Sequence, residues 1–192
     1  MKYNILIKSI IFTLFLFSAS YAKCINIKNH NISKNVNFIE IKINNERKFL
    51  TEISRKLLNY QKMEYRDFDR KRKYKAEIIF HYLNGEKCVY PGKIRAHGDQ
   101  DDHIDLIDGT PVSSLRVNLQ EGNIKNVTKF ILFRPKSRNS DNEIFVSTLL
   151  SHLGFLSPKS FYINIKLQDK IHKYIFQENL KKEFLENNKR VE

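Results

Sequence analysis

Several short motifs that mark common enzyme classes are absent from this sequence. It contains no GxSxG nucleophile elbow, no HExxH zinc-protease helix, no GxxxxGK[ST] phosphate loop and no GxGxxG dinucleotide turn. Each of these motifs supplies a specific piece of chemistry, such as an activated serine or a backbone cradle for phosphates. Their absence removes support for a simple serine hydrolase, a metalloprotease, a P-loop enzyme and a Rossmann dehydrogenase.

Cysteine is scarce, since Cys24 and Cys88 are the only two. Their spacing excludes the CxxC pattern of a thiol redox motif or a zinc site. In an oxidising compartment a pair of cysteines favours one disulfide. Two unpaired thiols are the alternative, and the sequence leaves both readings open.

The sequence also lacks an apolar run of the length that a transmembrane helix requires, about 20 residues. The first 22 residues instead have the parts of a secretory signal, with Lys2 and Lys8 before the apolar stretch 10–17 and small residues at Ser20 and Ala22. An uncleaved anchor is the alternative. Lys23, just before Cys24, argues against lipid attachment. We therefore expect a secreted or periplasmic protein with no transmembrane span after cleavage.

Acidic residues are few relative to basic ones, 21 against 34, which gives a formal net charge of +13. Such an excess favours anionic partners, among them nucleotides, anionic lipids and cell-wall polymers. Nucleic acid is not expected for an exported protein. No internal repeat or low-complexity block divides the chain. We expect a signal peptide over 1–22, a flexible leader over 23–36 and one domain over 37–192.

Hydrophobic periodicity predicts a series of strands and helices. Alternating residues indicate strands, and apolar residues at helical spacing indicate helices. The expected elements are a strand over 37–43, a helix over 46–60, a hairpin of 75–82 and 89–96 around Asn84-Gly85, a loop over 98–113, strands over 114–119 and 129–133, a hairpin of 161–167 and 171–178, and a short helix over 179–187. The pattern predicts an α+β fold, mainly an antiparallel sheet with two or three packed helices.

One further helix is expected to begin at Asp141 and to end before Gly154. Asp141 is a good capping residue, and Gly154 can adopt the left-handed conformation that closes a helix. The residues of its apolar face, which we expect to pack on the sheet, are Ile144, Phe145, Thr148, Leu149 and Leu150.

A candidate metal site lies in the segment 95–108, which concentrates carboxylates and imidazoles after a predicted strand. Asp99, Asp102 and His103 could hold a divalent cation, with Gly98 allowing a tight turn. The spacing matches no known calcium or zinc pattern. A solvated acidic loop is the alternative reading.

A candidate anion site comes from basic residues on or just after the predicted central strands: Arg95, Arg116, Lys129, Arg134, Lys136 and Arg138. Because side chains alternate along a strand, Arg116 and Asn118 share one face. If their strands are neighbours, Arg95, Arg116 and Arg134 could converge to bind phosphate through their guanidinium groups. The alternative is a solvated basic face or one that meets a membrane electrostatically.

Glu178, at the end of the last predicted strand, is a further candidate. It could contact a ligand at the strand edge. The alternative is a carboxylate that stabilises the first turn of the following helix through the helix dipole.

Four segments in order resemble the CotH-type spore-coat protein kinase family, in particular its exported relatives: 93–103, 113–119, 130–135 and 177–190. The resemblance begins at about residue 75 and covers only the amino-terminal part of that family. It implies the nucleotide-binding lobe of an atypical secreted kinase, which transfers phosphate from ATP to protein serines with Mg²⁺. By position, Arg95, Arg116 and Arg134 match basic residues of that lobe, and Glu178 matches its acidic residue.

The second lobe of that family, which should bring the catalytic and metal-binding aspartates, has no counterpart in this chain. We therefore expect the ATP-binding half of a kinase that is not catalytically complete alone, so the catalytic residues are unknown and enzymatic activity is left open. The alternative is an exported, non-enzymatic module that uses a basic face to hold an anionic surface polymer, a lipid or a partner protein.

Overall fold

The structure is a computed structural model that describes residues 36–61, 72–98, 101–124 and 127–189. The predicted signal peptide, nearly all of the predicted leader, Cys24 and Asp99 lie outside the described residues. Val36, which we assigned to the leader, already begins the first strand.

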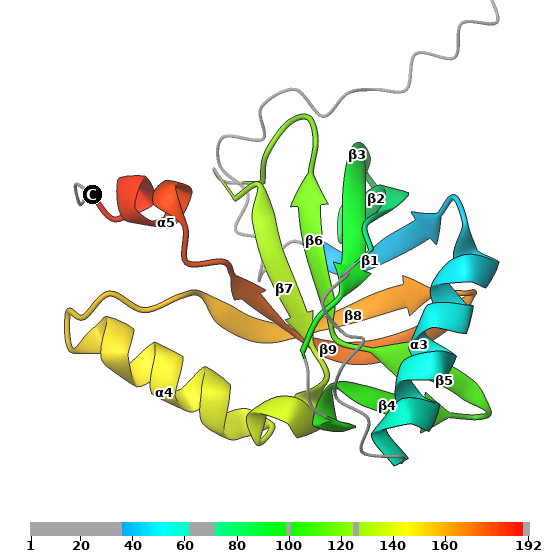
Figure 1. Cartoon of the computed structure of the whole chain (residues 1–192). Helices are drawn as coiled ribbons and strands as arrows, with labels where there is room; N and C mark the ends of the chain where they lie inside the picture. Colours follow the sequence, from blue (N-terminus) through cyan, green and yellow to red (C-terminus); the bar gives the residue numbers. More distant parts are fainter. Residues whose placement is uncertain (1–35, 62–71, 99–100, 125–126, 190–192) are drawn as a thin grey trace, which may run out of the picture.

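The fold is built on one sheet that closes into a seven-stranded barrel (Figure 1). In order around the barrel, the strands are β1 (Val36–Ile43), β2 (Tyr74–Tyr82), β3 (Lys87–Ala96), β6 (Leu115–Leu119), β7 (Lys129–Phe133), β9 (Lys170–Glu178) and β8 (Ser160–Leu167). Every neighbouring pair is antiparallel except β1 and β8, which run parallel and close the barrel. The predicted α+β class and mainly antiparallel sheet are confirmed, whereas the closure of this sheet into a barrel was not predicted.

The barrel interior is filled with apolar and aromatic side chains. Phe130 lies at its centre, with its ring 4.8 Å from that of Phe176 and 6.3 Å from that of Phe80. All three rings are buried. Since side chains alternate across a strand, this filled interior obliges the intervening polar residues of each strand to point outward.

A helix and a small hairpin lie together beside the barrel. Helix α3 (Glu46–Gln61) buries Phe49 and Ile53 in the main core and contacts β4 (Ile104–Ile107) and β5 (Thr110–Ser113). These two strands pair around Asp108-Gly109, both of which have positive φ. The loop predicted over 98–113 is therefore wrong: it contains this hairpin and a short 3-10 helix, η2 (Asp101–His103), and Asp-Gly is a common signal for such a turn.

A second, smaller core lies on the outside of the barrel. Ile131, Phe133 and Ile175 form it, and Ile144 of helix α4 (Asp141–His152) packs against it. Gly154 closes α4 with a φ of +79°, as expected. The packed face that we predicted is wrong, however, because Phe145, Thr148, Leu149 and Leu150 are all exposed.

The last described helix is α5 (Lys182–Asn187), which begins three residues later than predicted. Cys88 lies fully buried in β3 and is disulfide-bonded. Cys24, the other cysteine of the chain, lies outside the described residues. Within the described ranges, no helix has the length and apolarity needed to cross a bilayer.

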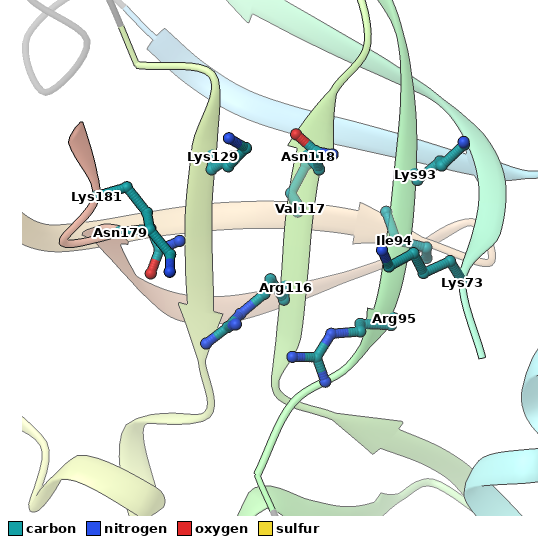
Figure 2. Close-up of a pocket in the computed structure, with 10 residues that line it drawn as sticks. All are labelled: Lys73, Lys93, Ile94, Arg95, Arg116, Val117, Asn118, Lys129, Asn179 and Lys181. Carbon is teal, nitrogen blue, oxygen red and sulfur yellow. The ribbon is translucent and has the colours of Figure 1, made fainter. Parts of the chain in front are cut away.

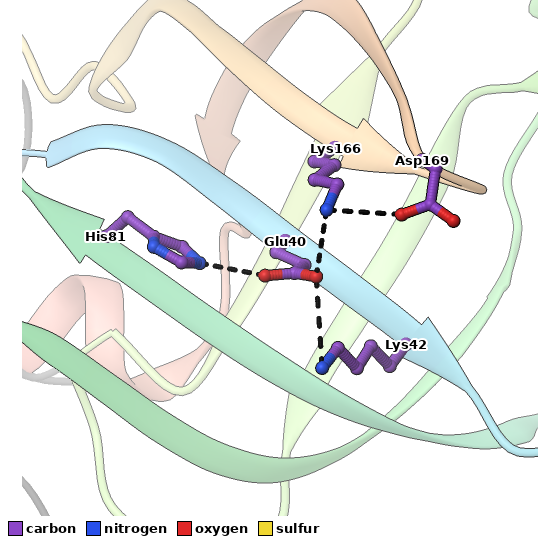
Figure 3. Close-up of polar contacts among 5 residues, drawn as sticks. All are labelled: Glu40, Lys42, His81, Lys166 and Asp169. Atoms are coloured by element: carbon purple, nitrogen blue, oxygen red, sulfur yellow. Dashed lines mark hydrogen bonds and ion pairs between the residues drawn. The ribbon is translucent and has the colours of Figure 1, made fainter.

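Polar contacts on the outer surface reinforce the barrel where β1 joins its two neighbours (Figure 3). The Glu40 carboxylate of β1 accepts a hydrogen bond of 2.9 Å from His81 of β2, and it lies 3.4 Å from the Nζ atom of Lys166 of β8. Burial acts to raise the pKa of Glu40, but the hydrogen bond from His81 and the nearby ammonium groups of Lys166 and Lys42 hold it below its ordinary value.

Replacement of Glu40 tests this contribution to barrel closure. A carboxyl whose pKa is lowered by folding stabilises the native state above its ordinary pKa of 4.5, and this stabilisation is lost as the pH falls through the folded value. We expect Glu40→Gln to lower the free energy of unfolding at pH 7 by about 1 kcal/mol. The difference should shrink in strongly acidic buffer. Urea unfolding at both pH values measures it.

The matched control is Glu77→Gln, which removes an exposed carboxylate from the neighbouring strand β2. Its effect should be small at both pH values. A Glu40→Gln protein as stable as the wild type at pH 7 would contradict the expected role.

Candidate functional site

A basic pocket lies on the outer face of the barrel over β3, β6 and β7 (Figure 2). It is an open cavity of about 240 Å³. The strands supply most of its walls, and the segments before β2 and after β9 complete it. The residues that line it are Lys73, Lys93, Ile94, Arg95, Arg116, Val117, Asn118, Lys129, Asn179 and Lys181.

Strand register brings two guanidinium groups together in this pocket. Arg95 of β3 is paired directly with Arg116 of β6, and both side chains are on the outer face (Figure 2). Like charges directly opposite each other across a strand pair are destabilising unless an anion lies between them. The Nε atom of Arg116 is buried and makes no hydrogen bond within the described part of the chain. An anion in the pocket would reduce the repulsion between the two guanidinium groups.

The neighbouring register positions extend the basic surface. Asn118 is paired with Lys93 on one side and with Lys129 on the other. The ammonium group of Lys129 lies 3.2 Å from the carboxylate of Glu183, which therefore neutralises part of its charge. Among the residues that line the pocket there is no carboxylate. The pocket is thus strongly cationic.

A partly buried imidazole borders the two arginines. The ring of His97 lies 5.2 Å from that of Phe133, and its backbone N–H donates to the carbonyl of Ser114 at 2.8 Å. Burial lowers the pKa of His97 to about 3, and the positive charges of Arg116 and Arg95 add to the effect. We therefore expect this histidine to be neutral at physiological pH.

Two of the four residues predicted to bind the cofactor lie away from the pocket. Arg134 follows β7 with its guanidinium 3.6 Å from the Asp105 carboxylate and 5.2 Å from the ring centroid of Tyr174. Glu178 is buried, and one of its carboxylate oxygens accepts a hydrogen bond of 3.4 Å from Asn187. The physical reason is strand alternation. Arg134 and Glu178 fall on the inward side of the sheet, with Phe130 and Phe176. Arg95 and Arg116 face outward. The predicted convergence of three arginines is wrong for Arg134.

The predicted metal ligands are only partly visible. Asp102 and His103 are neighbours, with 3.8 Å between the carboxylate and Nε2, and the Nδ1 atom of His103 lies 3.1 Å from the hydroxyl of Ser114. Asp99 lies outside the described residues. Across the described ranges no cluster of three or more His, Cys, Asp or Glu side chains is suited to a metal. The divalent-metal site stays a prediction, because Asp102 and His103 alone do not make up a ligand set.

Gly98 confirms the tight turn predicted at the start of this loop. Its φ is +89°, and a Cβ atom at this position would overlap the ring of His103. Only glycine fits there without displacing that ring. The turn therefore holds His103 close to His97, whose ring centroid is 5.6 Å away.

Sequence reasoning missed several residues of the pocket. Lys93 shares the outward face of β3 with Arg95, so alternation could have identified it. Lys73, Asn179 and Lys181 come from segments outside the strands, and no local pattern shows that they approach β3 and β7.

Comparisons with known proteins do not identify a function for this chain. No protein-family model matches this sequence, and no curated protein is significantly similar to it. The resemblance to the CotH-type kinases therefore depends on the four quoted segments alone. The geometry of the basic pocket is the firmest basis for a functional proposal.

Titration of His97 tests the electrostatics of the pocket. We expect its ring proton signals, followed by NMR, to titrate with a pKa of about 3. In Arg116→Gln the pKa of His97 should rise, because one of the charges that oppose protonation is removed. A wild-type pKa near the ordinary 6.5 would contradict the described burial and the positive field.

Proposed function

We propose that this protein is an exported anion-binding module whose basic pocket holds phosphate groups of its ligand. The observation that carries the proposal is the direct pairing of Arg95 with Arg116 on the outer face of the barrel, inside a pocket lined by four lysines. Two adjacent guanidinium groups present planar sets of N–H donors that match phosphate oxygens. Export itself depends on residues 1–22, which lie outside the described part.

The pocket suits a phosphate that is attached to a larger molecule. It is open to solvent, so a ligand can extend from it along the barrel surface. Asn118 and Asn179 add side chains that both donate and accept hydrogen bonds, which suits hydroxyl groups next to a phosphate. An anionic surface polymer or lipid headgroup has this chemistry. The proposal is thus the non-enzymatic alternative drawn from the sequence.

A nucleotide-binding kinase lobe is the second candidate, and the Arg95–Arg116 pair is the observation that favours it. ATP with Mg²⁺ requires both cations for the phosphates and carboxylates for the metal. The pocket supplies the first group of residues, whereas no carboxylate lines it. The residues present therefore fit phosphate but not Mg²⁺, and we derive no phosphoryl-transfer step from them.

Calorimetric titration with pyrophosphate tests the proposal. Arg116→Gln removes a charge-assisted hydrogen bond, worth about 1.5–3 kcal/mol, so the dissociation constant should rise about ten- to a hundredfold. Arg47→Gln is the matched control, since it makes the same change at an exposed position on α3. Its affinity should equal that of the wild type. Equal losses in both variants would mean that pyrophosphate senses only net charge, and the pocket would not be the site.

Titration with ATP separates the two candidates. The anion-binding proposal expects ATP and tripolyphosphate to bind equally well and Mg²⁺ to weaken both, because the metal neutralises phosphate charge. The kinase-lobe candidate expects ATP to bind more tightly than tripolyphosphate, and more tightly with Mg²⁺ than without it.

A further inference from the structure

Helix α4 presents its apolar side chains outward, away from the barrel that it packs on. The side chains that face the barrel are Ile144 and Ser147, and the hydroxyl of Ser147 donates to that of Ser160 at 3.3 Å. On the opposite side, Phe145 is 66% exposed and Leu153, just after the helix, is 63% exposed. A helix of a globular protein ordinarily has the reverse arrangement.

The exposed apolar residues form one continuous stripe along the helix. At 100° per residue, positions 145, 149 and 153 and positions 146 and 150 fall within one arc. Two further exposed apolar side chains, Phe155 and Leu156, follow the end of the helix. We call this set the outer face of α4; its members are Phe145, Val146, Leu149, Leu150, Leu153, Phe155 and Leu156. Contiguous apolar surface of this kind marks an interaction site.

Basic residues lie at both ends of this outer face. The short helix η3 (Pro135–Arg138), which packs against the start of α4, carries the exposed Lys136. Arg138 of the same helix is turned toward the barrel, with its guanidinium 4.0 Å from the ring centroid of Phe133. Lys159 is exposed just beyond the other end. The acidic residues of the first turn are engaged with the barrel side, since Asp141 accepts a hydrogen bond of 2.7 Å from the Tyr162 hydroxyl and Glu143 accepts one from Gln177.

This combination of charge and apolar surface distinguishes between possible occupants. If a second copy of the chain packed its outer face on the first, it would bring the same cationic groups of both copies together, in a chain of net charge +13. An anionic lipid surface instead attracts those cations and accepts the apolar side chains below its headgroups. Charge complementarity therefore favours the bilayer.

We propose that the outer face of α4 docks the protein on a bilayer that contains anionic lipid. Phe145, Leu149 and Leu153 enter the boundary between headgroups and acyl chains, while Lys136 and Lys159 contact the headgroups. The helix lies in the plane of the surface and does not span it. This inference is independent of the basic pocket, so a failure to bind pyrophosphate does not affect it.

The chain contains no tryptophan, so a single introduced tryptophan reports on one position. Full-length Phe145→Trp is mixed with vesicles of phosphatidylcholine and phosphatidylglycerol in equimolar amounts. We expect its emission to shift to shorter wavelength and to be quenched by brominated acyl chains. Phosphatidylcholine vesicles alone should cause neither change. Leu83→Trp, at a position that is 67% exposed in the β2–β3 turn, is the control and should show neither change with either vesicle.

Vesicle sedimentation of a triple variant measures the contribution of the outer face. Replacing Phe145, Leu149 and Leu153 with Gln should lower the partition coefficient at least about tenfold, given the apolar area withdrawn from the bilayer. The matched control replaces Leu83, Leu106 and Ile171 with Gln. These side chains are similarly exposed in the β2–β3 turn, in β4 and in β9, and the variant should partition as the wild type does. Circular dichroism and pyrophosphate titration verify that both variants fold.

Several results would overturn the proposal. Unchanged Phe145→Trp emission with the anionic vesicles would do so, as would equal partitioning of the two triple variants. A wild-type dimer in analytical ultracentrifugation that the α4 substitutions convert to monomer would identify the outer face as a self-association surface instead.

Discussion

The parallel pairing of β1 with β8 is the contact on which the rest of the molecule depends, because it turns a sheet into a closed barrel. Closure gives every strand one side that faces a packed interior and one that faces outward. Phe80, Phe130 and Phe176 fill the interior. On the outer surface of this seam, the Glu40 carboxylate lies 3.4 Å from the ammonium group of Lys166 of β8. It also accepts a hydrogen bond from His81 of β2 and so joins β1 to both neighbours.

The basic pocket is a consequence of that constraint. Strands β3, β6 and β7 each have apolar residues at the inward positions, so Arg95, Arg116 and Lys129 must project from the outer surface. Antiparallel register then places Arg95 opposite Arg116. The pocket needs no special loop to gather these charges. An anion between the two guanidinium groups would relieve their repulsion, which is the physical basis of the proposed function.

Most of the secondary structure could be predicted, because strands such as 75–82 and 114–119 have strong alternation and their turns contain Asn-Gly or similar pairs. Barrel closure could not be predicted, since it depends on the pairing of β1 with β8, which are more than a hundred residues apart.

The sequence predicted only part of the candidate site. Alternation identified Arg116 as an outward residue. Arg134 lies one position beyond β7 and falls on the same inward side as Phe130 and Leu132. The outward face of α4 was missed because periodicity shows that a helix has an apolar side and not what that side contacts.

The most direct test of the central claim is NMR of the labelled full-length chain during titration with pyrophosphate. The account predicts that the largest amide shifts fall on Arg95, Arg116, Asn118 and Lys129, and that they saturate together with a single dissociation constant. Shifts that concentrate instead around Arg134 and Glu178, or that scatter over all lysines without saturating, would contradict it.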